Sequence, residues 1–219
     1  MKGVCILVIL MVSALSANMR AEIVAHDTIT ASEAFVELPI SVLDLIDKSR
    51  RMDMLDYYAA DSIAKIPNVM EGLSFLDKVT RDYVKANLTP VSTITVKVLP
   101  LKRGEVVMTA YTIGDKDQAY DTELRFYDSN YTELKTAKFI KPATLDDFFD
   151  YPDKESKKRV AELVPFPTVR YEPDVNGTGM SAELTVGQFM SADDYASIKP
   201  LLKPRLHYKW TGSKFNLEK

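Results

Sequence analysis

Two pairs of closely spaced aspartates are the residues of this sequence best suited to acid–base chemistry. Asp53 and Asp56 lie three residues apart in the segment KSRRMDMLDYYAAD, and Asp146 and Asp147 are adjacent. A glycosidase-type hydrolase needs two carboxyl groups facing each other across a cleft, which spacing along the chain cannot establish. The alternative is structural: a charged solvent face of a helix for the first pair, and helix capping for the second. Asp53 and Asp56 also remain candidates for an acidic contact site.

Aromatic side chains on predicted strands are a second set of candidates, for binding rather than catalysis. Tyr127 lies in a predicted strand, and Tyr208 and Trp210 alternate along a C-terminal hairpin. Strand aromatics usually pack in the core, but on one exposed sheet face they form a contact surface for carbohydrate or protein. The candidate binding residues are therefore Asp53, Asp56, Tyr127, Tyr208 and Trp210.

Several other chemistries lack the residues that they require. Cys5 is the only cysteine and lies in an N-terminal apolar run, so the remaining chain has no thiol chemistry or disulfide. His26 and His207 are far apart, and the SxxK match at 62–65 lacks its companion motifs. We expect no cofactor and no metal, with calcium at the acidic turns of 115–123 left open. The formal net charge of −3 without a basic stripe argues against nucleic acid as a partner.

The N-terminus has the order of a secretory signal. Lys2 precedes an apolar run from Val4 to Leu15, and the small residues after it fit cleavage near residue 17. A membrane-spanning helix needs roughly 20 apolar residues, more than this run supplies. The sequence therefore predicts a signal peptide at 1–17 and an exported mature chain at 18–219 without a membrane span.

The elements that would position these residues indicate a single α+β domain over 18–219. An edge strand around 34–36 is one option for the N-terminal stretch. Helices are predicted from Pro39 to 47 and after Ser49, a possible cap, with Met52, Leu55 and Ala59 as the buried stripe and Arg50 paired with Asp53. Strands at 92–100, 105–114 and 121–130 are joined by short turns, which predicts an antiparallel meander with the helices packed on it.

The second half predicts an extension of this sheet. A short helix follows Pro142, and a charged helix covers 153–164. The proline- and glycine-rich segment 165–179 is interpreted as an irregular connection, where a sub-lobe border is left open. A strand at 180–186, a helix at 191–202 and a hairpin at 205–218 then form a C-terminal strand–helix–hairpin extension that we expect to close the sheet.

A succession of short motifs resembles a family of uncharacterised exported proteins from Bacteroidales, defined only as a domain of unknown function. The motifs, in chain order, are Arg51-Met52-Asp53-Met54-Leu55-Asp56-Tyr57, Glu71-Gly72-Leu73-Ser74 after Asn68, Thr80-Arg81-Asp82-Tyr83, Val98-Leu99-Pro100-Leu101, and Tyr208-x-Trp210 with Lys214-Phe215. The resemblance covers nearly the whole mature chain, although this chain has only Gly72 where two glycines are expected after Asn68. It implies a periplasmic or secreted location in a Gram-negative bacterium, and it implies no activity.

These observations predict a non-catalytic exported envelope protein that binds a protein or glycan partner. A carboxylate-dependent hydrolase of envelope material is the alternative, and a permanent structural subunit differs from the first prediction only in how long the partners stay together. The sequence leaves the oligomeric state open.

Overall fold

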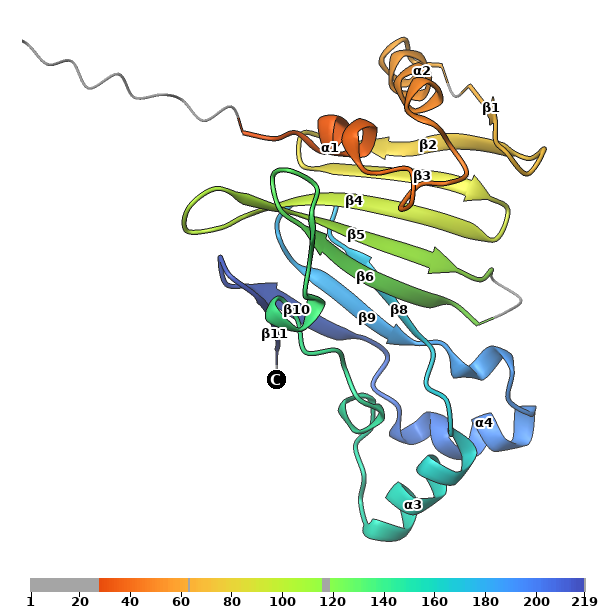
Figure 1. The fold of residues 1–219 in the computed structure, drawn as a ribbon. Coiled ribbons are helices and arrows are strands. Elements are labelled where there is room, and N and C mark those ends of the chain that lie inside the picture. Colours follow the sequence, from red (N-terminus) through yellow and green to blue (C-terminus); the bar gives the residue numbers. More distant parts are fainter. Residues whose placement is uncertain (1–27, 63, 116–118, 219) are drawn as a thin grey trace, which may run out of the picture.

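The structure is a computed structural model that describes residues 28–218 except 63 and 116–118. The described residues form a mixed α+β fold with two antiparallel sheets and four α-helices (Figure 1). The predicted fold class is therefore confirmed at this level. The predicted signal peptide, residues 1–17, lies outside the described residues.

The larger sheet is an antiparallel meander in which seven strands follow one another in chain order. The strands are β1 (Ile66–Pro67), β2 (Leu73–Val79), β3 (Tyr83–Thr89), β4 (Ser92–Pro100), β5 (Glu105–Ile113), β6 (Asp121–Tyr127) and β7 (Glu133–Leu134). β4 and β5 pair along their whole length, from Ser92 opposite Ile113 to Pro100 opposite Glu105. The three predicted strands are confirmed, the third ending three residues early. β2 and β3 form an antiparallel hairpin ahead of them.

The alternation along β4 explains how this central strand is covered on both faces. Ile94, Val96 and Val98 are buried on the face that carries the N-terminal helices. On the opposite face Thr95 and Lys97 are buried as well. A strand covered on both sides must place its polar side chains against other parts of the protein, and Lys97 is the main case.

The helices α1 (Ala31–Glu37) and α2 (Lys48–Ala59) lie along β2, β3 and β4 (Figure 1). The suggestion of an edge strand at 34–36 is wrong, because Thr30 and Glu33 form a capping box that starts α1 there. The predicted helix at 39–47 is a series of turns. Asp47, rather than Ser49, caps α2 by accepting a hydrogen bond from the backbone N–H of Arg50 at 2.9 Å.

The C-terminal strands form a separate sheet and do not extend the meander. This smaller sheet has the order β11-β10-β9-β8. Its strands are β8 (Val169–Pro173), β9 (Met180–Leu184), β10 (Leu206–Trp210) and β11 (Phe215–Leu217). β8, which the sequence analysis interpreted as irregular connection, is an edge strand ending at Pro173, the position where a proline costs no ladder hydrogen bond.

Short helices lie between β7 and β8, where the chain passes from one sheet to the other, and between β9 and β10 of the smaller sheet. The α-helices are α3 (Lys154–Leu163) and α4 (Ala192–Ile198), and the 3-10 helices are η1 (Thr136–Lys138), η2 (Leu145–Phe148), η3 (Val186–Gln188) and η4 (Lys199–Leu201). They close a hydrophobic core between β5–β6 and the smaller sheet, whereas a second hydrophobic core lies under α1 and α2. The smaller sheet covers only part of the larger one, and the face of β2–β4 beside β8 is left partly open.

Candidate functional site

The helix α2 carries its two candidate carboxylates on the solvent side. Asp53 and Asp56 are exposed, and Arg50 pairs with Asp47 at 2.7 Å rather than with Asp53. The predicted buried stripe is wrong for Met52, which is 50% exposed, and for exposed Ala59, whereas Leu55 is partly buried against the core. Arg51 and Met54 are the fully buried residues of the helix. The buried face of α2 is therefore rotated relative to the predicted one, and it includes the side chain of an arginine.

Arg51 is the residue of this segment with a specific structural role. Its side chain is buried, and its guanidinium donates hydrogen bonds to the carbonyls of Phe35 at 2.9 Å and Leu38 at 2.8 Å. These carbonyls belong to the C-terminal end of α1, where helix carbonyls lack partners within the helix. Burial lowers the pKa of Arg51, and nearby Asp47 and Glu37 oppose this shift. Arg51 therefore ties α2 to α1.

We predict that replacing the exposed α2 carboxylates has almost no effect on stability. Asp53→Asn and Asp56→Asn each remove a solvated charge with no ion pair among the described residues. The free energy of unfolding, measured by urea titration, should change by less than ~0.5 kcal/mol. A larger loss would show that these carboxylates make contacts that the structure does not contain.

The three aromatic candidates are core residues. Tyr127 packs in the core under the helices, while Tyr208 and Trp210 lie in the core between the sheets. Trp210 donates from Nε1 to the carbonyl of Pro100 at 2.7 Å, and Tyr208 lies 6.1 Å from the ring centre of Tyr171. Burial raises the pKa of the Tyr127 and Tyr208 hydroxyls. Packing, rather than an exposed aromatic surface, therefore accounts for these three side chains.

Asp146 and Asp147 lie on η2, beside a depression of about 640 Å³ that His207 also lines. Asp146 pairs with Lys157, and Asp147 accepts hydrogen bonds from the backbone N–H and the hydroxyl of Thr144, both at 2.7 Å. Burial alone would raise the pKa of Asp147, but the hydrogen bonds from Thr144 lower it overall. The ion pair of Asp146 and the capping box of Asp147 therefore give both carboxylates a structural role.

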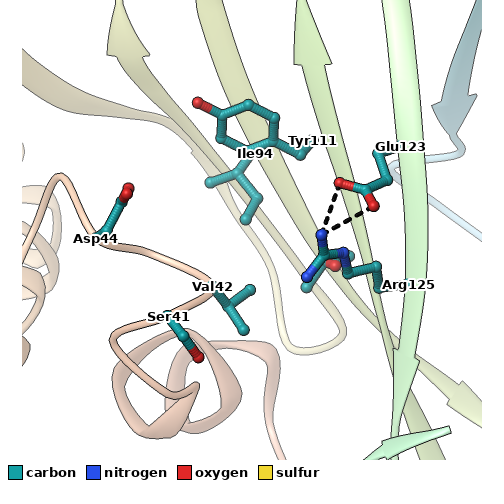
Figure 2. A pocket seen from close by; sticks show the side chains of 8 residues that line it. Ser41, Val42, Asp44, Ile94, Tyr111, Glu123 and Arg125 are labelled. Carbon is teal, nitrogen blue, oxygen red and sulfur yellow. Dashed lines mark hydrogen bonds and ion pairs between the residues drawn. The ribbon is translucent and has the colours of Figure 1, made fainter.

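A small pocket of about 190 Å³ lies between the 41–44 loop and strands β4–β6, as Figure 2 shows. Its charged groups are Asp44 on the loop and the pair Glu123–Arg125 on β6, joined at 2.9 Å. Because the arginine is already paired, this pocket offers no free cation to a ligand. Its size and chemistry make it a weaker candidate than the open sheet face.

The most developed candidate is a groove between the open face of the larger sheet and β8. It consists of two adjoining pockets, of about 380 and 260 Å³, that share Asp77, Lys85 and Glu172 in their linings. The larger pocket is also lined by Phe75 of β2, Asn87 of β3, Thr93 and Thr95 of β4, Thr112 of β5, Tyr120, and Arg170 of β8. We refer to these two pockets together as the groove.

Most charged groups of the larger pocket are engaged with one another. Glu172 pairs with Arg170 at 3.2 Å and with Lys85 at 3.6 Å, which joins β8 to β3 across the groove. Arg170 also lies over the ring of Tyr120, 4.9 Å from its centre. Asp77, Glu172, Lys85 and Arg170 are two acids and two bases, so the lining carries no net charge.

A buried ion pair closes one end of the groove. The Lys97 side chain is 0% exposed, and its Nζ lies 2.8 Å from Oδ2 of Asp82 and 3.5 Å from the carbonyl of Val175. The loop after β8, which holds Val175, is thereby fixed to the centre of the larger sheet. Burial alone would raise the pKa of Asp82, but the hydrogen bond and charge of Lys97 lower it overall.

None of the five candidate binding residues chosen from the sequence lines the groove. Thr93, Thr95 and Lys97 could be assigned to one face of β4, but nothing in their spacing shows that β8 lies beside that face. Within the described ranges there is no group of three or more His, Cys, Asp or Glu residues that could hold a metal ion. No helix in the described part of the chain is long and apolar enough to cross a membrane.

Comparisons with known proteins agree with the fold and assign no activity. The model of a family described as protein of unknown function (DUF3256) matches residues 22–215. A solved domain of an uncharacterized protein from Porphyromonas gingivalis W83 aligns with a TM-score of 0.74 and 18% sequence identity, covering 85% of this chain and 96% of that one. At this identity the likeness concerns the fold alone. No match was found among curated proteins.

Proposed function

The chain belongs to the DUF3256 family of proteins of unknown function, and we propose that it is a non-catalytic binding protein whose groove holds a protein or glycan partner. The observation that carries this proposal is the groove itself: a concave, partly open sheet face whose charges balance in the larger pocket and whose remaining lining there is polar and aromatic. Pockets with a few convergent polar groups are the usual place for ligands.

The state of the acidic residues supports binding over hydrolysis. Asp53 and Asp56 lie on an exposed helix face, and Asp146 and Asp147 are held by an ion pair and a capping box. A glycosidase-type hydrolase needs two carboxyl groups facing each other across a cleft, whereas the first pair lies on a solvent face and the second serves an ion pair and a cap.

We further propose that the protein acts outside the cytoplasm, in the periplasm or as a secreted protein of a Gram-negative bacterium. The support is the order of the first residues, a lysine followed by an apolar run and small residues. A partner in the cell envelope would be accessible from that location.

The test is capture of an envelope partner by tagged residues 18–219, with gentle crosslinking and mass spectrometry. Thr93→Arg places a long charged side chain inside the groove, and Asn216→Arg, on exposed β11, is the matched control. We expect one stoichiometric partner with the native chain and with the control, and loss of that partner with Thr93→Arg, although both variants keep their circular dichroism spectra.

Equal capture by both variants would exclude the groove as the contact surface. Release of sugar from isolated envelope material, abolished by Asp146→Asn or Asp147→Asn, would instead establish the hydrolase.

A further inference from the structure

A row of aligned side chains crosses the groove from strand to strand. The register places Phe75 opposite Asn87, Asn87 opposite Thr93, and Thr93 opposite Thr112. Neighbouring strands lie about 4.8 Å apart, so the amide and two hydroxyls form a ladder with that repeat, beginning at an aromatic ring. Each of the three groups can both donate and accept a hydrogen bond.

Two members of this ladder are available to a ligand. Within the part of the chain that the structure describes, the side chains of Asn87 and Thr93 have no hydrogen-bond partner, and both are half-buried in the pocket lining. Thr112 shares its hydroxyl with Thr122 at 2.9 Å, which leaves it one further site as an acceptor or donor. Half-buried polar groups gain most from a ligand that supplies the missing hydrogen bonds.

The remaining lining favours a neutral ligand with apolar faces. Glu172 contacts both Arg170 and Lys85, and Asp77 supplies the second negative charge of the larger pocket, so the pocket has no net positive charge to attract an anionic ligand. Phe75 and Tyr120 add aromatic surface to the lining, although Lys65 and Arg170 lie over their respective rings. Aromatic rings pack against apolar ligand surface while neighbouring polar groups fix its orientation.

The edge of the sheet beside the groove argues against a peptide that adds as a strand. β1 already pairs with the first residues of β2, Leu73 and Ser74. Beyond them the pairing of β2 with β3 shifts between Leu76 and Lys78, a bulge at Asp77. Bulges at sheet edges twist the backbone away from further pairing, so strand addition is blocked here.

We infer that the groove binds a neutral, hydroxyl-rich oligosaccharide along the Asn87–Thr93–Thr112 ladder. This inference rests on the proposed binding function and narrows its ligand to one class. Sugar hydroxyls donate and accept as the ladder does, and the carbon-bound faces of sugar rings provide the apolar surface for Phe75 and Tyr120. Binding through neutral hydrogen bonds should depend little on ionic strength.

The experiment is an array of oligosaccharides followed by isothermal titration calorimetry with purified residues 18–219. The neutral probes are maltohexaose, xylohexaose, mannohexaose and hexa-N-acetylchitohexaose, and the charged probe is hexagalacturonate. We expect binding of at least one neutral probe, with similar affinity at low and high salt. Asn87→Ala and Thr93→Ala should each weaken it by roughly tenfold, while Asn216→Ala on β11 should leave it unchanged.

Asn87→Ala and Thr93→Ala lie on adjacent strands, so the second variant still tests the inference if the first one fails to fold. Circular dichroism checks that both variants are folded. The inference is overturned if only hexagalacturonate binds, if no probe binds, or if Asn87→Ala and Thr93→Ala bind as the native chain does. Capture of a stoichiometric envelope protein that Thr93→Arg abolishes, without any oligosaccharide binding, would overturn the ligand class and leave the binding function standing. Capture unaffected by Thr93→Arg would remove the binding function of the groove itself.

Discussion

Replacement of Arg51 by alanine should lower the free energy of unfolding by ~3 kcal/mol. The guanidinium is 2% exposed and satisfies the carbonyls of Phe35 and Leu38 at the end of α1. Without it, the two carbonyls lose the guanidinium as their partner, and the exposed ion pair between Lys48 and Glu37 still joins the helices. Urea unfolding followed by circular dichroism measures the change.

The neighbouring arginine is the matched control for this substitution. Arg50 makes a partly exposed pair with Asp47, so Arg50→Ala should cost less than ~1 kcal/mol. Arg51→Met separates hydrogen bonding from packing, because methionine fills much of the same space without donors. If Arg51→Met unfolds at the urea concentration of the native chain, the two carbonyl contacts contribute nothing and the prediction fails.

Arg51 also shows where sequence patterning succeeds and where it stops. The segment 48–59 is a helix, as its spacing predicts, but that spacing assigned Met52, Leu55 and Ala59 to the buried side and did not include Arg51, a residue type that is rarely buried. Arg51 is buried because the C-terminal end of α1 lies against this helix, and the carbonyls there accept hydrogen bonds from the guanidinium. That end was not predicted, since 34–36 was considered a strand.

The meander shows the same division between local and long-range information. Alternation within β4 correctly assigned Ile94, Val96 and Val98 to one face. The ladder of the groove depends on the register of three strands and on the position of β8, which no spacing within one segment contains. The prolines and glycines around β8 led to the prediction of an irregular connection, so this side of the groove was not predicted to contain a strand.

Asp82→Ala should destabilise the protein by about 2 kcal/mol, whereas Lys97→Met should stay within ~1 kcal/mol of the native chain. Removing Asp82 leaves a fully buried ammonium with the Val175 carbonyl at 3.5 Å and the ring of Tyr83 at 5.6 Å. Removing Lys97 instead leaves a carboxylate that is 42% exposed and can be hydrated. This exposure is why the expected loss is below the 3–5 kcal/mol typical of fully buried pairs.

The same pair gives a pH dependence of known sign. The folded-state pKa of Asp82 is lowered overall, so the pair contributes stability above the ordinary aspartate value of about 3.9, and this contribution is lost as pH falls through the lower folded-state value. The difference in unfolding free energy between the native chain and Asp82→Ala should therefore be present at neutral pH and shrink in strong acid. Urea titrations across this range measure both effects. If Lys97→Met proves less stable than Asp82→Ala at neutral pH, packing of the lysine stem, rather than its charge, joins the loop after β8 to the larger sheet.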